Sequence, residues 1–197
     1  MKSLLLTSIF TIGLFSLYSC GPDLTKYQYL KEPHITTQPR QKMIIVEIQG
    51  DPSVAGKRAF QALFSTFYKL KKGRKDIKMV PPRARWPKSF DTPRNEWLGI
   101  YGLPLPENVT TLPVKKKESD PDVRLAYWEY GEVAEILHRG PYSEEYNTIV
   151  LLYKFIEENG YKIAGYHEEE YLKGPGWLFK GDPKKYQTII RYQIEKE

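Results

Sequence analysis

The sequence predicts an α+β protein in which a strand–helix–strand–strand unit occurs twice. The order of apolar runs, turn residues and helical patterns repeats at an offset of 89 residues, which sets Pro52 against Pro141. At that offset the apolar face of one predicted helix falls onto that of the other, with Phe60 matched to Ile149. Each half alone buries little surface, so we expect a shared, mainly antiparallel sheet with both helices on the same face. The two halves are then related by a pseudo-twofold axis.

The composition fits a globular domain behind a leader. The chain has 197 residues, of which 41% are hydrophobic and 27% are charged, and it has 1 cysteine. This apolar content fills a core, which excludes collagen-like and wholly disordered classes. A single cysteine excludes disulfide scaffolds and cysteine-rich zinc sites. The only long apolar run lies at the N-terminus, which excludes a protein with several membrane spans.

Residues 1–19 have the pattern of a lipoprotein signal peptide. Lys2 precedes an apolar stretch, residues 4–18, that is shorter than the roughly 20 residues needed to span a bilayer. The stretch ends in Leu-Tyr-Ser-Cys-Gly, which resembles the bacterial lipobox, and Cys20 is the only thiol. We expect cleavage before Cys20 and lipidation there by acyl chains such as palmitate, which anchors the protein to a membrane of the bacterial cell envelope. The alternative is an uncleaved anchor with an incidental cysteine.

The first repeat follows a polar, turn-rich segment, residues 20–34, which we expect to be a lipidated tether. The globular domain spans residues 35–197, and its first repeat about residues 35–106. A helix is predicted over 53–70, because apolar residues recur at i, i+3, i+4 and i+7. β-Branched and extended runs, one of them interrupted by two prolines, predict strands at 34–37, 43–48, 77–86 and 96–103. Residues 107–123 are predicted to be a linker.

The second repeat, about residues 124–197, has the same order of elements. A strand over 132–138 stops at the Gly140-Pro141 turn, and a helix follows over 143–158. Asn159-Gly160 closes this helix, as Asn or Gly commonly does at a helix C-terminus. Apolar and aromatic residues that alternate along the chain predict the remaining strands, at 161–172 and 185–195.

The charge pattern argues against a nucleic-acid partner. The formal net charge is +6, but the leader exports the chain and no recognition-helix motif is visible. Many of the cations cluster between Lys69 and Lys78, where the first helix ends. Such a cluster complements a helix C-terminus and keeps the surface solvated. A dedicated patch for anionic lipids is the alternative.

Three segments of the second repeat carry a resemblance to a known family. They are Ile136–Tyr142 (ILHRGPY), Gly165–Leu172 (GYHEEEYL) and Asp182–Tyr192 (DPKKYQTIIRY). In order and spacing they resemble the GyrI-like small-molecule-binding domain, which is also the effector-binding domain of AraC-type and multidrug-responsive regulators and is related to SOUL haem-binding proteins. The first repeat is more divergent. The resemblance implies a cleft between the two helices and the sheet.

The resemblance also assigns a role to Glu169. In the family, a glutamate two residues before the Tyr-Leu end of this strand supplies the counter-charge in the cleft. A carboxylate among aromatic rings attracts organic cations through charge and cation–π interactions. Strand alternation puts Glu169 on one face with His167 and Tyr171, and Glu168 and Glu170 on the other. The alternative is that all three glutamates are solvated on a strand rim.

We expect aromatic side chains to form the walls of this cleft. The candidates for contact with the ligand, besides Glu169, are Tyr171, Tyr101, Trp128, Tyr166, Trp177 and Tyr192. The alternative is that these rings belong to the core or the sheet surface, because the chain has 15 tyrosines. His34 and His167 lack the spacing of metal ligands, so we predict no metal site, and without a Gly-rich phosphate loop we predict no cofactor.

Three functions remain open at this stage. The first, which we favour, is a membrane-anchored module that binds small cationic or amphipathic organic molecules without a catalytic residue. The second is a hydrolase of small electrophiles, such as the cyclopropane-bearing compounds that some family members hydrolyse, with Glu169 as base and Tyr171 or Tyr101 as the polarising hydroxyl. The third is a structural or interaction lipoprotein without a ligand.

Overall fold

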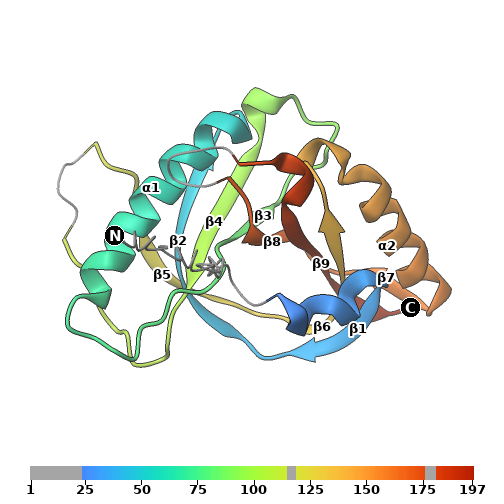
Figure 1. Ribbon diagram of the computed structural model, residues 1–197, viewed down its shortest axis with the longest axis horizontal. Coiled ribbons are helices and arrows are strands. Elements are labelled where there is room, and N and C mark those ends of the chain that lie inside the picture. Colours follow the sequence, from blue (N-terminus) through green and yellow to red (C-terminus); the bar gives the residue numbers. More distant parts are fainter. Residues whose placement is uncertain (1–23, 115–118, 176–180) are drawn as a thin grey trace, which may run out of the picture.

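A computed structural model describes residues 24–114, 119–175 and 181–197 of the chain (Figure 1). The predicted signal peptide, Cys20 and Trp177 lie outside these ranges, as does part of the predicted linker. Within the described ranges, none of the helices combines the length and the apolar character that crossing a bilayer requires.

The described chain forms an α+β fold, as predicted. The two α-helices are α1 (Pro52–Lys71) and α2 (Tyr146–Glu158). The strands are β1 (His34–Gln38), β2 (Gln41–Gln49), β3 (Arg83–Trp86), β4 (Leu98–Pro104), β5 (Arg124–Trp128), β6 (Gly131–Arg139), β7 (Tyr161–Ile163), β8 (His167–Lys173) and β9 (Gln187–Lys196). Short 3-10 turns are η1 (Thr25–Lys31), η2 (Arg94–Glu96), η3 (Tyr142–Glu144) and η4 (Pro183–Lys185).

The order of the strands in the sheet reflects the duplication of the chain. All pairs are antiparallel, and the order is β1-β6-β9-β8-β3-β4-β2-β5, with β7 paired to β9. Read outward from the central β8–β3 pair, one side runs β8, β9, β6 and the other β3, β4, β2. These are the corresponding strands of the two repeats, so the order itself has the predicted pseudo-twofold relation.

The two repeats also exchange their first strands. β1 pairs with β6 of the second repeat, and β5 pairs with β2 of the first. Only two residues separate β1 from β2, and two separate β5 from β6. Continuous chain therefore joins each edge of the sheet to a strand near the opposite edge, which requires the sheet to curl upon itself and gives it an inner and an outer face.

Both helices pack on the same face of the sheet, as predicted, and this is the outer face. Directly paired residues share a face of a sheet, and one such row runs through Val46, Tyr101, Ala84, Glu169 and Ile190. At one end of the row, Val46 and Tyr101 pack in a cluster with the buried side of α1. At the other end, Ile190 packs with that of α2. Figure 1 shows β3 and β8 between the two helices, so Glu169 occupies the middle of the row.

The predicted tether is partly folded onto the domain. Residues 25–31 form η1, and Leu30 is fully buried against Leu137, Leu172 and Ile189. Residues 25–31, predicted as part of the lipidated tether over 20–34, therefore pack on the folded domain. The polar composition of this segment favoured a tether, but its buried leucine packs against the inner face of the sheet.

Other element boundaries differ for local reasons. The strand predicted over 77–86 is reduced to β3, because Pro81 and Pro82 lack the N–H groups that a sheet ladder needs. The strand predicted over 161–172 divides into β7 and β8 around Gly165. A Cβ at that glycine would lie 2.6 Å from a side-chain oxygen of Gln193, so the close packing of the chain there requires glycine.

Candidate ligand-binding site

The three consecutive glutamates of β8 alternate between the faces of the sheet. All three are buried, with exposed fractions of 2% for Glu168, 8% for Glu169 and 5% for Glu170. In the pairing with β3, Glu169 lies opposite Ala84, whereas Glu168 lies opposite Arg85 and Glu170 opposite Arg83. The alternation is as predicted, but the alternative of a solvated rim is wrong for all three residues.

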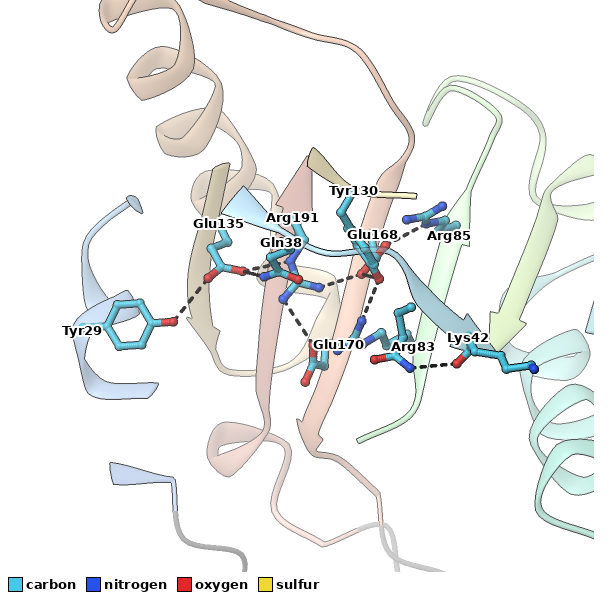
Figure 2. A network of polar contacts seen from close by, with 11 residues as sticks. Tyr29, Gln38, Lys42, Arg83, Arg85, Tyr130, Glu135, Glu168, Glu170 and Arg191 are labelled. Carbon is cyan, nitrogen blue, oxygen red and sulfur yellow. Dashed lines mark hydrogen bonds and ion pairs between the residues drawn. The ribbon is translucent and has the colours of Figure 1, made fainter. Parts of the chain in front are cut away.

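On the inner face, an ionic row crosses four strands. Strand register places Glu135, Arg191, Glu168 and Arg85 opposite one another in sequence across β6, β9, β8 and β3. Arg191 donates from Nε to Glu135 at 2.9 Å and from Nη1 to Glu168 at 2.7 Å, while Arg85 donates from Nε to Glu168 at 2.7 Å. Figure 2 shows these side chains turned toward one another. Alternating charge along the row neutralises each buried carboxylate.

Further contacts complete this inner network. Glu170 lies 3.0 Å from Nη2 of Arg83 and 3.3 Å from Nη2 of Arg191. The hydroxyl of Tyr130 donates to Glu168 at 2.9 Å. Burial would raise the pKa of Glu168, but the charges of Arg191 and Arg85 outweigh it and hold that pKa below its usual range. Glu168 and Glu170 on the inner face therefore form ion pairs that stabilise the fold.

Glu169, on the outer face, has a different set of partners. Its Oε1 lies 3.0 Å from Nε2 of His167, and its Oε2 accepts a hydrogen bond of 2.5 Å from the Tyr171 hydroxyl. Among the described residues, neither lysine nor arginine forms an ion pair with it. Burial and the charge of Glu169 raise the pKa of the Tyr171 phenol well above its usual range, so this hydroxyl stays protonated as a donor.

The imidazole of His167 links Glu169 to two tyrosines. Its Nδ1 lies 2.5 Å from the hydroxyl of Tyr192, which lies 3.1 Å from the hydroxyl of Tyr153 on α2. Burial raises the pKa of Tyr192 as well. The chain of contacts fixes the plane of the imidazole and so holds Nε2 toward the carboxylate.

The side chain of Glu145, a residue not predicted to belong to the site, also lies near His167 and Glu169. One ligand atom from each of Glu145, His167 and Glu169 lies within 4.8 Å of the other two. Burial, followed by the charge of Glu169, raises the pKa of the Glu145 carboxyl to about 9. A sequence signal for it existed, because Glu145 precedes the buried residues Ile149 and Leu152 by four and seven positions and so lies on the apolar stripe of α2.

Aromatic rings surround the outer-face carboxylate. The ring of Phe60 on α1 lies 5.3 Å from that of Tyr101 and 5.9 Å from that of Tyr171, measured between centroids. Tyr142 lies 5.7 Å from Tyr171. Tyr101 is buried, and its hydroxyl has no hydrogen-bond partner among the described residues. Burial and the charge of Glu169 raise the pKa of this phenol.

An apolar groove adjoins the site and shares Tyr171 with it. It has a volume of about 400 Å³. Its lining comes from α1, the segment before β3 and the end of β8, namely Phe64, Tyr68, Met79, Val80, Pro81, Pro82, Tyr171 and Leu172. Tyr171 therefore contributes its hydroxyl to Glu169 and also contributes to the wall of the groove.

Only some of the aromatic residues predicted to line the cleft lie near Glu169. Tyr101, Tyr171 and Tyr192 lie on the outer face around Glu169. Trp128 lies on the inner face, where its ring stacks at 4.2 Å on the guanidinium of Arg85, so the sheet separates it from Glu169. Tyr166 precedes β8 and is half exposed, with no described contact to the carboxylate. Trp177 lies outside the described residues.

The chain matches a known protein family. The family model described as the GyrI-like small molecule binding domain matches residues 31–191, which is most of the chain. A comparison with curated protein sequences gives no significant match.

Solved structures give further similarities. A hydrolase from Listeria innocua is 27% identical, with a TM-score of 0.68 over 84% of this chain and 92% of that chain. An uncharacterized conserved protein from Listeria innocua is 25% identical, with a TM-score of 0.72 over 87% and 98%. The C-terminal domain of EcmrR is 14% identical, with a TM-score of 0.56 over 84% and 98%, and shares the fold.

Proposed function

This chain belongs to the GyrI-like small-molecule-binding family, and on that premise we propose that it binds small organic cations against the carboxylate of Glu169. The aromatic rings around Glu169 contact the cation, and the groove beyond Tyr171 takes an apolar part of the same ligand. Amphipathic cations are therefore the ligand class.

One observation carries this proposal. Three successive glutamates are buried, and arginines neutralise the two on the inner face but not the one on the outer face. A buried carboxylate without a cation is costly, and the favourable arrangement is to pair it. In the part of the chain that the structure describes, Glu169 has an imidazole and a phenol as partners but neither lysine nor arginine, so an organic cation from outside would supply the missing charge.

The surroundings of Glu169 support the same ligand class. Tyr171 contacts the carboxylate, and the rings of Phe60 and Tyr142 pack against that of Tyr171. Tyr101 packs against Phe60 in turn, so this side of the site offers ring faces or edges rather than charged groups. A cation over an aromatic face gains about 0.5–2 kcal/mol, and the gain is larger where water is excluded. Quaternary or delocalised cations suit such a site, because they need no hydrogen-bond acceptors beyond one carboxylate.

The test uses two dyes of one skeleton. Crystal violet is a cationic triarylmethane, and its leuco form is neutral at pH 7. Calorimetric titration of the full chain in a non-ionic detergent should show saturable binding of the cation and at least tenfold weaker binding of the leuco form, because one charge contact is lost. Equal affinities would show a neutral apolar pocket and refute the cation proposal.

Hydrolysis of a small electrophile is the second candidate. The hydrogen bond from Tyr171 to Glu169 and the similarity to a hydrolase from Listeria innocua favour it. In this scheme Glu169 accepts a proton from water as the water oxygen bonds to a ring carbon and a ring C–C bond breaks. The electron pair of the broken bond takes up a proton, and a nearby phenol, Tyr171 or Tyr101, donates a hydrogen bond to the group that carries the developing negative charge. Incubation with a cyclopropane-bearing electrophile in ¹⁸O-labelled water, followed by mass spectrometry, should give a labelled addition product with the unsubstituted chain and none with Glu169→Gln.

The same proposal includes a lipid anchor. The only cysteine ends a signal-peptide pattern, and acylation at Cys20 would hold the domain at a membrane of the bacterial cell envelope. The binding site then meets molecules outside the cytoplasm, so the protein acts as an anchored receptor or scavenger. A structural lipoprotein without a ligand is the reading that remains if neither dye nor electrophile binds.

A further inference from the structure

We propose that Glu145, His167 and Glu169 form a site for a divalent transition-metal ion of the Zn²⁺ class. These residues come from the start of α2 and from β8. Their grouping could not be predicted from local spacing, because more than twenty positions separate Glu145 from His167. The fold brings one ligand atom of each to within 4.8 Å of the others.

A second observation points to a ligand at this place. Glu145 is only 6% exposed, and within the described ranges its Oε1 makes no hydrogen bond of good geometry. Burial raises the pKa of this carboxyl, and the Thr188 side chain lies close enough to lower it slightly, but the Thr188 hydroxyl is also unpaired by the same criterion. Buried carboxylate oxygens are normally satisfied, and an orphaned one needs a specific explanation. The other two groups of the cluster are the nearest ligand atoms to it that carry metal-binding chemistry, and a shared cation would satisfy all three at once.

The geometry needs only a small adjustment. Nitrogen and oxygen ligands lie about 2.0–2.2 Å from Zn²⁺ in tetrahedral sites, which separates two ligand atoms by roughly 3.3 Å. His167 Nε2 and Glu169 Oε1 are already 3.0 Å apart. A rotation of the Glu145 side chain that moves its oxygen by about 1.5 Å, from the 4.8 Å limit to roughly 3.3 Å, would bring in the third ligand, and the fourth position would remain open.

The outer partners of these ligands are already in place. A metal-bound imidazole commonly uses its second nitrogen in a hydrogen bond, and ligating carboxylates are hydrogen-bonded in turn. Here His167 Nδ1 lies 2.5 Å from the Tyr192 hydroxyl, and Tyr171 donates to the second oxygen of Glu169. These contacts use Nδ1 of His167 and Oε2 of Glu169. The remaining atoms, His167 Nε2 and Glu169 Oε1, face each other at 3.0 Å and would bind the metal in place of that contact.

The ligand chemistry selects the class of ion. One imidazole and two carboxylates suit Zn²⁺ and its neighbours, whereas Ca²⁺ requires six to eight oxygens and Mg²⁺ an octahedron of oxygens. The metal would share Glu169 with the organic cation, so the two ligands compete. The metal site also uses Glu145 and His167, which the proposal for organic cations does not require. The two proposals can therefore be tested separately.

The test is titration of the full chain with zinc chloride in a non-ionic detergent, followed by elemental analysis of the gel-filtered protein. We expect one Zn²⁺ per chain, and for Glu145→Gln at least the roughly 10–100-fold loss that removal of an outer-shell partner causes. Glu144→Gln, the exposed neighbour on the same turn, is the matched control and should bind normally. Absence of binding, or binding that Glu145→Gln leaves unchanged, would overturn the proposal.

X-ray absorption on the unsubstituted chain gives a measurement that does not depend on variant folding. The zinc edge should show nitrogen and oxygen ligands near 2.0 Å with an imidazole signature. A sulfur ligand near 2.3 Å would assign the metal to Cys20 instead and refute the site. Crystal violet binding with no zinc binding would refute the metal proposal alone.

Discussion

Glu168 and Glu169 are adjacent on β8, yet they lie on opposite faces of the sheet and have opposite electrostatic surroundings. The carboxylate of Glu168 contacts Arg191 and Arg85, each at 2.7 Å. The carboxylate of Glu169 contacts an imidazole and a phenol. One position along a strand therefore separates a residue that stabilises the curled sheet from the residue to which we assign the ligand.

Glu168→Gln should destabilise the fold far more than Glu169→Gln. The first change leaves the buried guanidinium of Arg191 without one of its three carboxylates, and breaking a buried pair costs about 3–5 kcal/mol. The second change removes no ion pair with arginine. Urea unfolding of the two variants checks this, and equal losses would contradict the division of roles between the faces.

The same ionic row predicts how stability depends on pH. The folded-state pKa of Glu168 is lowered, so the unfolded chain binds this proton more readily than the folded one. The stabilisation is present above the ordinary pKa of 4.5 and is lost as pH falls through that value toward the lowered one. Thermal unfolding at a series of pH values below 5 should therefore show a smaller pH dependence in Glu168→Gln than in the unsubstituted chain.

Leu30→Ala should cost about 2–5 kcal/mol, the usual range for truncating a buried leucine. Leu30 is fully buried against Leu137, Leu172 and Ile189. Leu24→Ala, a partly buried neighbour in the same segment, is the control and should cost less. If Leu30→Ala unfolds at the same urea concentration as the unsubstituted chain, residues 24–33 do not belong to the cooperative fold.

Much of the fold follows from local patterns. The offset between Pro52 and Pro141 predicts the duplication, because at this offset a turn and the apolar face of the helix after it coincide in the two repeats. Alternation along β8 predicts the face of Glu169, because successive side chains of a strand point to opposite sides. These inferences need no knowledge of which strands pair.

The features of the fold and the site that depend on which strands pair could not be predicted from the sequence. Trp128 faces inward because β5 pairs with β2 of the other repeat, and that exchange leaves no local trace. Glu168 is buried because register aligns it with Arg191 and Arg85, which lie more than twenty and more than eighty positions away. The partner of each charge is set by register, so the sequence pattern alone favoured solvated glutamates.

Cys20→Ser should release the chain from the membrane if the lipid anchor is present. The serine hydroxyl does not form the thioether, so this variant should move to the aqueous phase in a detergent partition, while the unsubstituted chain stays in the detergent phase. Mass spectrometry of the mature N-terminus provides the control for cleavage. A cleaved variant that still enters the detergent phase would refute lipidation at Cys20.

The affinity of Glu169→Gln for crystal violet tests the central claim most directly. The amide keeps the shape of the side chain and removes its charge, so we expect binding to weaken by about 1–3 kcal/mol, or roughly 5- to 150-fold in Kd. Glu144→Gln, an exposed change of the same chemistry, should bind the dye as the unsubstituted chain does. An unchanged Kd in a folded Glu169→Gln variant would contradict the assignment of Glu169 as the counter-charge for a cationic ligand.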